Sequence, residues 1–322
     1  MTATVSDTFL QRLREGDPRA VARAITIMEA GGAAATDLHR VVLPWTGRAL
    51  TVGFTGPPGA GKSTLIDAFA LELRKGGRTV AIAAVDPSSP LSGGAVLGDR
   101  VRMGRHTEDP GVFIRSIASR GHLGGLNESI QAIVDVFDAA GRDVIVIETV
   151  GAGQSEVEIA EVADVRIVVN APGLGDDVQA IKAGILEIAS ILVVNKADLP
   201  LAGRTVRQLR SMLTLRREKD RNVPVVETVA NSGQGVTRLL EVVLSLAPRT
   251  PAERHARRRA RLRRQLAEAA AADARRRILG RNDKAFCATF ARIEAGGLSI
   301  EEAARALALK NESTANDSAT HR

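Results

Sequence analysis

The sequence predicts an α/β fold in which a mostly parallel β-sheet is covered by helices. The first observation behind this prediction is a set of short apolar runs rich in valine and isoleucine, as expected of strands buried on both faces. The second is that most runs are followed by a loop and a helix-like segment, the alternation that produces parallel sheets. Six runs lie at residues 50–55, 79–86, 143–149, 165–172, 191–198 and 223–229, and a seventh candidate strand lies at 111–117.

Composition narrows the range of functions. Apolar residues make up 44% of the 322 residues but aromatic residues only 2%, so the core must be aliphatic. Few aromatic side chains are available to stack on bases, which argues against single-stranded nucleic-acid binding. The single cysteine, Cys287, excludes a disulfide framework within the chain and fits a reducing cytoplasm. Because no signal-like start and no apolar run of about 18 residues is present, we expect a cytoplasmic protein without a membrane span.

The domain organisation follows from changes in sequence pattern. Helical periodicity comes first, the α/β pattern follows, and a segment nearly free of β-branched residues comes after it. The end of the chain is polar and is predicted to be disordered. The predicted boundaries are 1–48 for an N-terminal helical extension, 49–250 for the α/β domain, 251–308 for a C-terminal helical arm and 309–322 for the tail.

Helix ends outside the α/β domain are indicated by capping residues. Ser6 or Asp7 can cap a first helix, and Pro18 suits the first turn of a second. In the arm, Gly280 is a candidate helix end, and Ser299 with a glutamate three residues later forms a capping-box pattern.

The net charge of +7 is concentrated in one part of the arm. Residues 251–281 contain eleven arginines, no lysine and three acidic residues. Three roles are open for this segment: a nucleic-acid patch, a solvated helix face or a dimerisation surface. The arginines surround much of the predicted helix and no aromatic side chains accompany them, so we expect no nucleic-acid partner.

Residues 53–65, GFTGPPGAGKSTL, contain the pattern G-x-x-x-x-G-K-S between a predicted strand and a predicted helix. Glycines let backbone N–H groups converge on phosphate oxygens, and the helix N-terminus adds positive potential. In such a P-loop the lysine reaches the β- and γ-phosphates and the serine hydroxyl binds Mg²⁺. The strand–loop–helix context disfavours a chance match. The predicted nucleotide-binding residues here are Gly56, Pro57, Pro58, Gly59, Ala60, Gly61, Lys62, Ser63 and Thr64.

A second loop indicates which base is bound. The sequence Asn-Lys-x-Asp at 195–198 stands at the end of an apolar run. The Asp198 carboxylate can accept two hydrogen bonds from the guanine ring N–H and amino group, a donor pair that adenine lacks. Asn195 is expected to tie the surrounding loops together, and the stem of Lys196 is expected to cover the base. The motif alone is common by chance, but after a P-loop it predicts guanine rather than adenine.

Acidic residues at strand ends are candidates for a metal site. Glu148 stands at the end of a run where ordinary small GTPases carry the aspartate of Asp-x-x-Gly. Asp86 ends another run, and Asp99 lies in the segment that follows it. Together with Ser63, these oxygen ligands could hold Mg²⁺ at the carboxyl edge of the sheet, where ligands bind in such folds. Each acid could instead be only a helix cap or a turn residue.

The motifs together resemble the MeaB/ArgK-type accessory GTPases, relatives of the metallochaperone GTPases in a group that includes the human methylmalonic aciduria type A protein. The matching segments lie within roughly residues 14–250. They read GDPRAVARAIT, GFTGPPGAGKSTLI, VDPSSPLSGGAVLGDRVRM, ETVGAGQSE, PGLGDDVQAIKAGILEIA and VVNKAD. The resemblance implies a P-loop NTPase domain whose phosphate–Mg²⁺ site is formed by Lys62, Ser63, Asp86, Asp99 and Glu148.

The resemblance also assigns two further segments. It implies that residues 173–182 form a third switch with Lys182 as the coupling residue, although a solvated helix lysine is the alternative. Lys62, Glu148 and Lys182 are therefore the candidate catalytic residues. The guanine-supporting loop of the family appears here without its usual serine, as VANSGQG from Val229. Because that loop binds mainly through backbone N–H groups, Val229 and Ala230 are still predicted to contact the nucleotide.

For function, the resemblance implies a GTP-hydrolysing chaperone that uses GTP/GDP and Mg²⁺ and forms a homodimer through its C-terminal helices. Its client would be an adenosylcobalamin-dependent acyl-CoA mutase, above all methylmalonyl-CoA mutase, whose cofactor loading it would gate and which it would protect. Gln154 and Gln179 are candidates for orienting water, but no catalytic residue of this kind can be assigned, so we expect slow turnover that a partner accelerates. Two alternatives stay open: a GTP-dependent regulatory protein without a mutase client, and a kinase-like ATPase linked to amino-acid transport.

Overall fold

A computed structural model describes most of the chain, which forms two compact units, residues 1–262 and 263–322. The described residues are 5–87, 106, 108–119, 125–149, 159, 162–173, 187–214, 222–248, 250–281 and 283–306. Within these ranges, the structure describes only the backbone of residues 86–87, 118–119, 125–129, 251 and 284–285.

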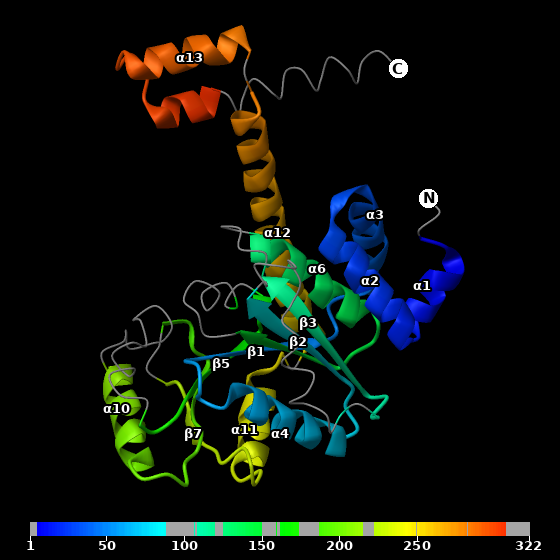
Figure 1. The fold of residues 1–322 in the computed structure, drawn as a ribbon, viewed down its shortest axis with the longest axis vertical. Helices are drawn as coiled ribbons and strands as arrows, with labels where there is room; N and C mark the ends of the chain where they lie inside the picture. Colours follow the sequence, from blue (N-terminus) through cyan, green and yellow to red (C-terminus); the bar gives the residue numbers. More distant parts are fainter. Residues whose placement is uncertain are drawn as a thin grey trace. The chain divides into compact units, whose positions relative to one another are not determined.

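The core of the first unit is a seven-stranded sheet in which every described strand pairing is parallel (Figure 1). The strand order is β3-β2-β4-β1-β5-β6-β7, which places β1 in the middle. The strands coincide with the seven apolar runs of the sequence, so the predicted α/β fold is confirmed. Their bounds are β1 (Leu50–Thr55), β2 (Val80–Pro87), β3 (Val112–Ser119), β4 (Val144–Thr149), β5 (Val165–Asn170), β6 (Ile191–Val194) and β7 (Val225–Glu227).

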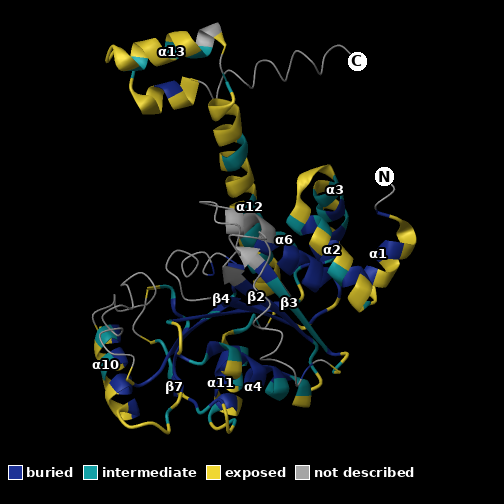
Figure 2. Ribbon diagram, in the orientation of Figure 1, coloured by how far each residue is buried: buried dark blue, intermediate teal, exposed yellow. Residues whose placement is uncertain are grey.

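Helices enclose the sheet, whose strands are largely dark blue in the burial colouring of Figure 2. Two helices form one apolar core with alternate residues of the strands. A third helix belongs to a second core, which contains the intervening strand residues. A fourth packs along β6 and β7. The buried side chains are mostly aliphatic, as the composition predicts. These helices are α4 (Lys62–Lys75) and α11 (Val236–Leu246) in the first core, α6 (Gly125–Ala139) in the second, and α10 (Ala202–Thr214) along the last two strands.

The N-terminal helices begin at the capping residues that the sequence indicates. The Ser6 hydroxyl accepts a hydrogen bond from the Phe9 backbone N–H at 3.3 Å. The Asp17 carboxylate accepts one from the Ala20 N–H at 2.8 Å, and this bond lowers the pKa of Asp17 below its ordinary value. Pro18 occupies the first turn, where a missing N–H costs little. The helices are α1 (Asp7–Arg14), α2 (Pro18–Ala30) and α3 (Gly32–Val42), and the last two pack against α6.

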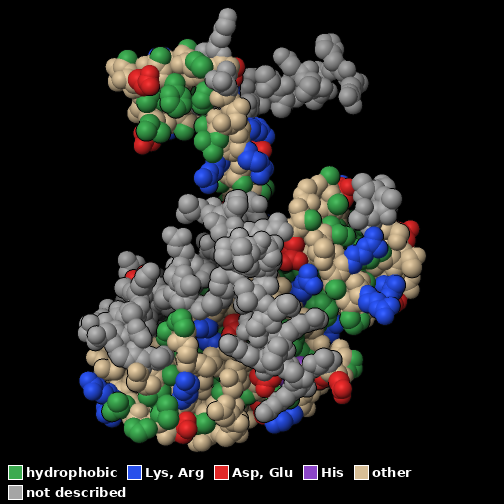
Figure 3. All heavy atoms as spheres, viewed as in Figure 1, with side chains coloured by type: hydrophobic (Ala, Val, Ile, Leu, Met, Phe, Trp, Pro, Cys, Tyr) green, Lys and Arg blue, Asp and Glu red, His purple; other side chains and the backbone are tan. Residues whose placement is uncertain are grey.

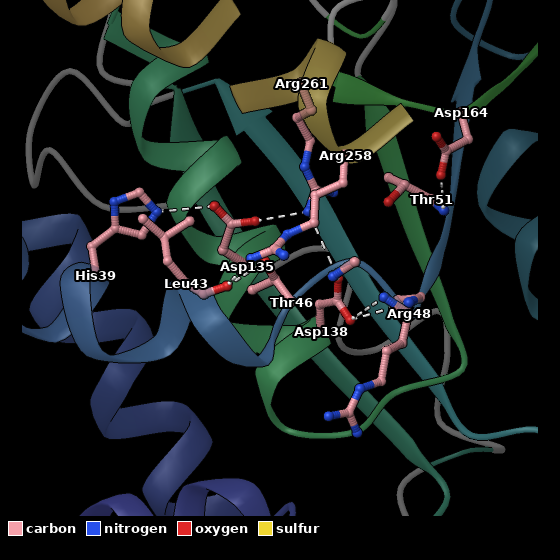
Figure 4. A network of polar contacts seen from close by, with 12 residues as sticks. His39, Leu43, Thr46, Arg48, Thr51, Asp135, Asp138, Asp164, Arg258 and Arg261 are labelled. Carbon is pink, nitrogen blue, oxygen red and sulfur yellow. Dashed lines mark hydrogen bonds and ion pairs between the residues drawn. The ribbon is translucent and has the colours of Figure 1, made fainter. Parts of the chain in front are cut away.

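Buried charges join the first turns of α12 (Pro251–Leu279) to α6, as Figure 4 shows. The side chains of Asp135 and Asp138 on α6 are fully buried. The Arg261 guanidinium donates to Asp135 Oδ1 at 3.0 Å and lies 3.7 Å from Asp138 Oδ2. His39 of α3 contacts the other Asp135 oxygen at 2.9 Å. Helices from three distant parts of the sequence therefore meet at one pair of buried carboxylates.

Asp138 also fixes the chain that leads into β1. Its carboxylate accepts hydrogen bonds from the backbone N–H groups of Gly47 at 2.6 Å, Arg48 at 3.2 Å and Ala49 at 3.1 Å. Burial raises the pKa of the Asp138 carboxyl above its ordinary value, while the backbone donors and the charge of Arg261 oppose that rise. The amino end of the central strand is thus held by a carboxylate that has no access to solvent.

The arginine-rich segment therefore has a role beyond the three that the sequence analysis considered. Arg258 donates to the Leu43 carbonyl at 2.6 Å, and Arg257 lies 3.6 Å from the Asp164 carboxylate. With Arg261, these arginines are committed to contacts inside the first unit. Charge counting along the sequence does not reveal such pairs, because Arg261 and Asp135 are separated by 126 residues.

The described residues of the second unit form the remainder of α12 and two further helices, one of them α13 (Lys284–Glu294). Helix α12 ends before Gly280, as predicted, and Asp283 caps α13. Ser299 and Glu302 exchange the two hydrogen bonds of a capping box, at 2.9 and 3.1 Å, at the start of the last helix. Among the described residues, no helix combines the length and the hydrophobicity needed to cross a bilayer.

We predict that Arg261→Gln destabilises the protein by about 3 kcal/mol at pH 7, because it leaves two buried carboxylates without their guanidinium. The folded-state pKa of Asp138 is already raised, so the stability it contributes is present at low pH and lost as the pH rises through that pKa. Removing Arg261 raises this pKa further, so the deficit should shrink at pH 4. Urea unfolding measures both effects. Arg259→Gln, at an exposed position of the same helix, is the control, and an equal loss in both variants would contradict the prediction.

Candidate functional site

The P-loop joins β1 to α4 and is shaped by two glycines. Gly56 has φ +138°, and a Cβ built on it would lie 2.1 Å from the Val169 carbonyl oxygen. Gly61 has φ +83°, and its Cβ would lie 2.5 Å from the Asn195 side-chain nitrogen. A side chain at either position would force the backbone away from a neighbouring strand or loop. The two glycines therefore let the loop lie directly against the ends of β5 and β6.

Lys62 is buried and folds back over the P-loop. Its Nζ donates to the carbonyl oxygens of Gly56 at 2.8 Å and Pro57 at 3.1 Å. Its exposed fraction is 7%, low for a lysine, which is rarely buried without partners. An ammonium held in this position can exchange these carbonyl oxygens for the oxygens of a bound phosphate, because both are hydrogen-bond acceptors.

Ser63, the next residue of α4, is paired with the end of β4. Its hydroxyl donates to Glu148 Oε1 at 2.7 Å. Glu148 is buried and lies beside Phe54 in the register of β1 and β4. A hydroxyl and a carboxylate side by side at the carboxyl edge of the sheet are the oxygen ligands that Mg²⁺ prefers. The residues present therefore fit a hard divalent cation.

Asn195 connects the P-loop to both loops that follow it. Its Nδ2 donates to the Ala60 carbonyl at 3.0 Å. Its Oδ1 accepts from the Thr228 hydroxyl at 3.2 Å and from the Ala230 N–H at 3.1 Å. The backbone N–H of Asn195 donates to the Asn170 carbonyl at 2.7 Å, which fixes the loop to the end of β5. With an exposed fraction of 2%, this amide is the buried centre of the site.

The residues after Asn195 also face the P-loop. Lys196 has φ 56°, a left-handed conformation that is uncommon outside glycine, and its Nζ donates to the Gly59 carbonyl at 2.8 Å. Its stem therefore runs across the top of the P-loop. The Asp198 side chain is exposed, and within the described residues no hydrogen bond or ion pair holds its carboxylate. An exposed acceptor beside this loop can bind a ligand that carries paired donors.

The loop that begins at Val229 is closed by its own backbone. Val229 donates to the Gln234 carbonyl at 2.9 Å, forming an isolated bridge. The Ala230 N–H donates to the Asn195 side chain, so in this conformation it is not available to a ligand. Thr228 is not among the residues predicted from the sequence, yet its buried hydroxyl completes the Asn195 network. Its position directly before the guanine-supporting loop is the signal that could have found it.

The structure therefore brings together the P-loop residues, Glu148 and the Asn195–Asp198 loop. Asp86 is the next-to-last residue of β2 and stands in register with Ala118, but its side chain is outside the description. The predicted residues Asp99, Gln154, Gln179 and Lys182 all lie outside the described residues.

The sequence model of the family described as "Methylmalonyl Co-A mutase-associated GTPase MeaB" matches residues 21–283. This chain belongs to the MeaB family. The MeaB-family chain is 51% identical to a putative GTPase of Pyrococcus horikoshii over 241 residues, 74% of this chain and 76% of that protein. It is 43% identical to the GTPase ArgK of Escherichia coli over 200 residues, 61% and 60% of the two chains. The resemblance inferred from the motifs is therefore confirmed.

Two further similarities extend across the family. The MeaB-family chain is 34% identical to the mouse protein named methylmalonic aciduria type A homolog, mitochondrial, over 256 residues that cover 74% of this chain and 62% of that protein. A solved structure titled "LAO/AO transport system kinase" has a TM-score of 0.71 at 25% identity and covers 96% of this chain and 99% of its own. The MeaB-family protein is thus a P-loop GTPase that binds guanine nucleotide.

We predict that Asn195→Ala weakens GDP binding by roughly 30-fold, because it removes the four side-chain hydrogen bonds that connect the P-loop to the two predicted guanine loops. At about 1 kcal/mol for each net hydrogen bond, a loss of about 2 kcal/mol is a conservative expectation. Thr228→Val removes only one of these bonds and should weaken GDP binding by roughly fivefold. Titration of fluorescent GDP measures both affinities. Binding of Asn195→Ala with wild-type affinity would show that the amide does not organise the site.

Proposed function

We propose that this GTPase is an accessory protein that gates adenosylcobalamin loading and protects an adenosylcobalamin-dependent acyl-CoA mutase, with methylmalonyl-CoA mutase as the first candidate client. The observation that carries the proposal is the family match over residues 21–283, because the family is described as associated with that mutase. The mouse relative, named for methylmalonic aciduria, supports the same direction. A cytoplasmic location and a client enzyme in the same compartment belong to the proposal.

The site supports a guanine nucleotide bound across the P-loop and the loop from Asn195 to Asp198. In this arrangement Lys62 turns from the carbonyls of Gly56 and Pro57 to the β- and γ-phosphates. Asp198, exposed at the edge of the site, accepts the two donors of guanine. The Asn195 amide keeps the phosphate and base subsites at a fixed separation, since it touches both loops.

The bound nucleotide is proposed to carry Mg²⁺. Ser63 and Glu148 would hold it, and their contact of 2.7 Å at the carboxyl edge of the sheet supports this assignment. Asp86 and Asp99 are proposed as further ligands from the resemblance alone. The cation would neutralise charge on the β- and γ-phosphates. Glu148 stands at the end of β4, so a change at the phosphates can reach the residues that follow this strand.

Coupling to the client and dimerisation are the remaining parts of the proposal. Lys182, in the predicted third switch, is proposed to transmit the nucleotide state to the mutase, and intrinsic turnover is proposed to be slow until the client binds. The second unit is proposed to form the homodimer contact. Its exposed large apolar side chains support this, since soluble monomers rarely expose much apolar surface and such surface marks interaction sites. They are Leu266, Leu279, Phe290 and Ile300, with exposed fractions from 53% to 75%.

The nucleotide assignment predicts a change of base preference. Asp198→Asn should weaken GDP binding by about 100-fold and improve binding of xanthosine diphosphate, because an amide donates where the carboxylate accepts and xanthine has a carbonyl where guanine has an amine. Competition against fluorescent GDP measures this. The wild-type protein should not bind ATP. Tight ATP binding would favour the alternative of a transport-linked kinase-like ATPase over the proposed function.

The client assignment predicts mutual effects between the two proteins. Adding methylmalonyl-CoA mutase should raise the rate of GTP hydrolysis at least tenfold, and the GTPase with GTP should lengthen the half-life of mutase activity during turnover. Lys62→Ala, which loses the phosphate contact, is the control and should give neither effect. Isobutyryl- and ethylmalonyl-CoA mutases are tested in parallel. If none of the three mutases changes GTP hydrolysis or is protected, the protein is a GTP-dependent regulator without a mutase client.

A further inference from the structure

The outer face of α10 carries a row of arginines that have no acidic partner among the described residues. Arg204, Arg207 and Arg210 are exposed at spacings of three residues, while the opposite side of the helix is buried against the sheet. The helix, AGRTVRQLRSMLT, contains no acidic residue. In the described part of the chain, none of the three arginines has an ion pair or a side-chain hydrogen bond. Figure 3 shows blue side chains over α10 beside hydrophobic ones, at the lower left of the molecule.

Several arginines on other helices of the first unit have an acidic partner. Arg12 pairs with Asp17, Arg40 with Asp37 and Arg238 with Glu241. Three guanidinium groups on one face without acids between them produce a local positive potential that attracts carboxylates. The pattern on α10 is therefore a charge complement to an acidic surface, and not an internally balanced helix face.

Two exposed leucines extend this face at the start of α10. Leu199 and Leu201 have exposed fractions of 43% and 57%. Leu201 also has φ 75°, a conformation that a leucine adopts only at a conformational cost. A glycine would fit this position without that cost, so the leucine stands here against the local backbone preference. Strained residues of this kind are found where a side chain has a binding or switching role.

The leucine turn is built directly on the guanine loop. The Leu199 N–H donates to the Lys196 carbonyl at 3.0 Å, and the Ala202 N–H donates to the Leu199 carbonyl at 3.3 Å. The Arg204 N–H then donates to the Leu201 carbonyl at 2.9 Å and starts α10. A molecule that binds to this turn can therefore shift the backbone of the residues that flank Asp198.

We propose that Leu199, Leu201, Arg204, Arg207 and Arg210, which we call the α10 face, are a docking surface for an acidic protein surface, and that docking there changes the rate of guanine-nucleotide release. Carboxylates of the partner pair with the arginines, and an apolar recess of the partner accepts Leu201. The leucines favour a protein over a nucleic acid, since a phosphate backbone offers them no apolar contact. With the mutase as the partner, this inference rests on the proposed function. It adds the surface of the GTPase that the client contacts.

The test compares two double charge reversals. Arg207→Glu/Arg210→Glu should weaken binding to methylmalonyl-CoA mutase at least tenfold and abolish the effect of the mutase on fluorescent GDP release, while basal GDP affinity stays unchanged. Arg19→Glu/Arg259→Glu alters the net charge equally at exposed positions of α2 and α12 and should bind the mutase like the wild type. Raising the salt concentration should weaken the wild-type complex more than the α10 variant complex.

A third variant separates docking from folding. Leu201→Gly should keep or raise the melting temperature, because it relieves the left-handed leucine, and yet weaken mutase binding at least threefold. If the wild type binds the mutase and the α10 variants bind it equally well, the inference is overturned while the proposed function stands. Wild-type protein that does not bind the mutase overturns both. Binding of DNA by the α10 face with micromolar affinity, lost in the charge reversal, would also overturn it in favour of a nucleic-acid surface.

Discussion

The side-chain amide of Asn195 is the contact on which the geometry of the candidate nucleotide site depends. It donates to the P-loop at Ala60 and accepts from Thr228 and Ala230, so three loops from separate parts of the sequence share one buried group. A buried amide must satisfy its hydrogen bonds or lose stability, and its donor and acceptor ends cannot be exchanged. The distance between the proposed phosphate and base subsites is therefore set before any nucleotide binds. The chain belongs to a family of GTPases, and we propose that this site binds the guanine nucleotide.

The parallel sheet makes this convergence possible. Strands β1, β4, β5 and β6 all end at one edge, and the P-loop, Glu148 and Asn195 follow from that shared direction. At the opposite end of β1, Asp138 holds the backbone N–H groups of the incoming chain. The central strand is thus fixed at both ends, by a buried carboxylate and by a glycine loop. Rigid support of this kind lets a loop carry function without losing its shape.

Much of this could be predicted from the sequence, and the rest was hidden for physical reasons. The strands, the helix caps at Ser6 and Ser299, the P-loop and the guanine loop follow from local patterns that repeat wherever such elements occur. The pairing of Arg261 with Asp135 could not be predicted, because partners 126 residues apart are chosen by the tertiary fold. The same holds for the buried Lys62, whose carbonyl partners depend on the loop conformation. The left-handed Lys196 and Leu201 contradict residue preference and are visible only in the folded chain.

Amide hydrogen exchange of Ala230 tests the central claim most directly. This N–H donates to the Asn195 side chain at 3.1 Å and reports on the link between the loops. If the site is organised in advance, the amide is protected in the nucleotide-free protein, is protected further by GDP, and is unaffected by ADP. Exchange at the rate of an unstructured loop without nucleotide, or equal protection by ADP and GDP, would contradict the account.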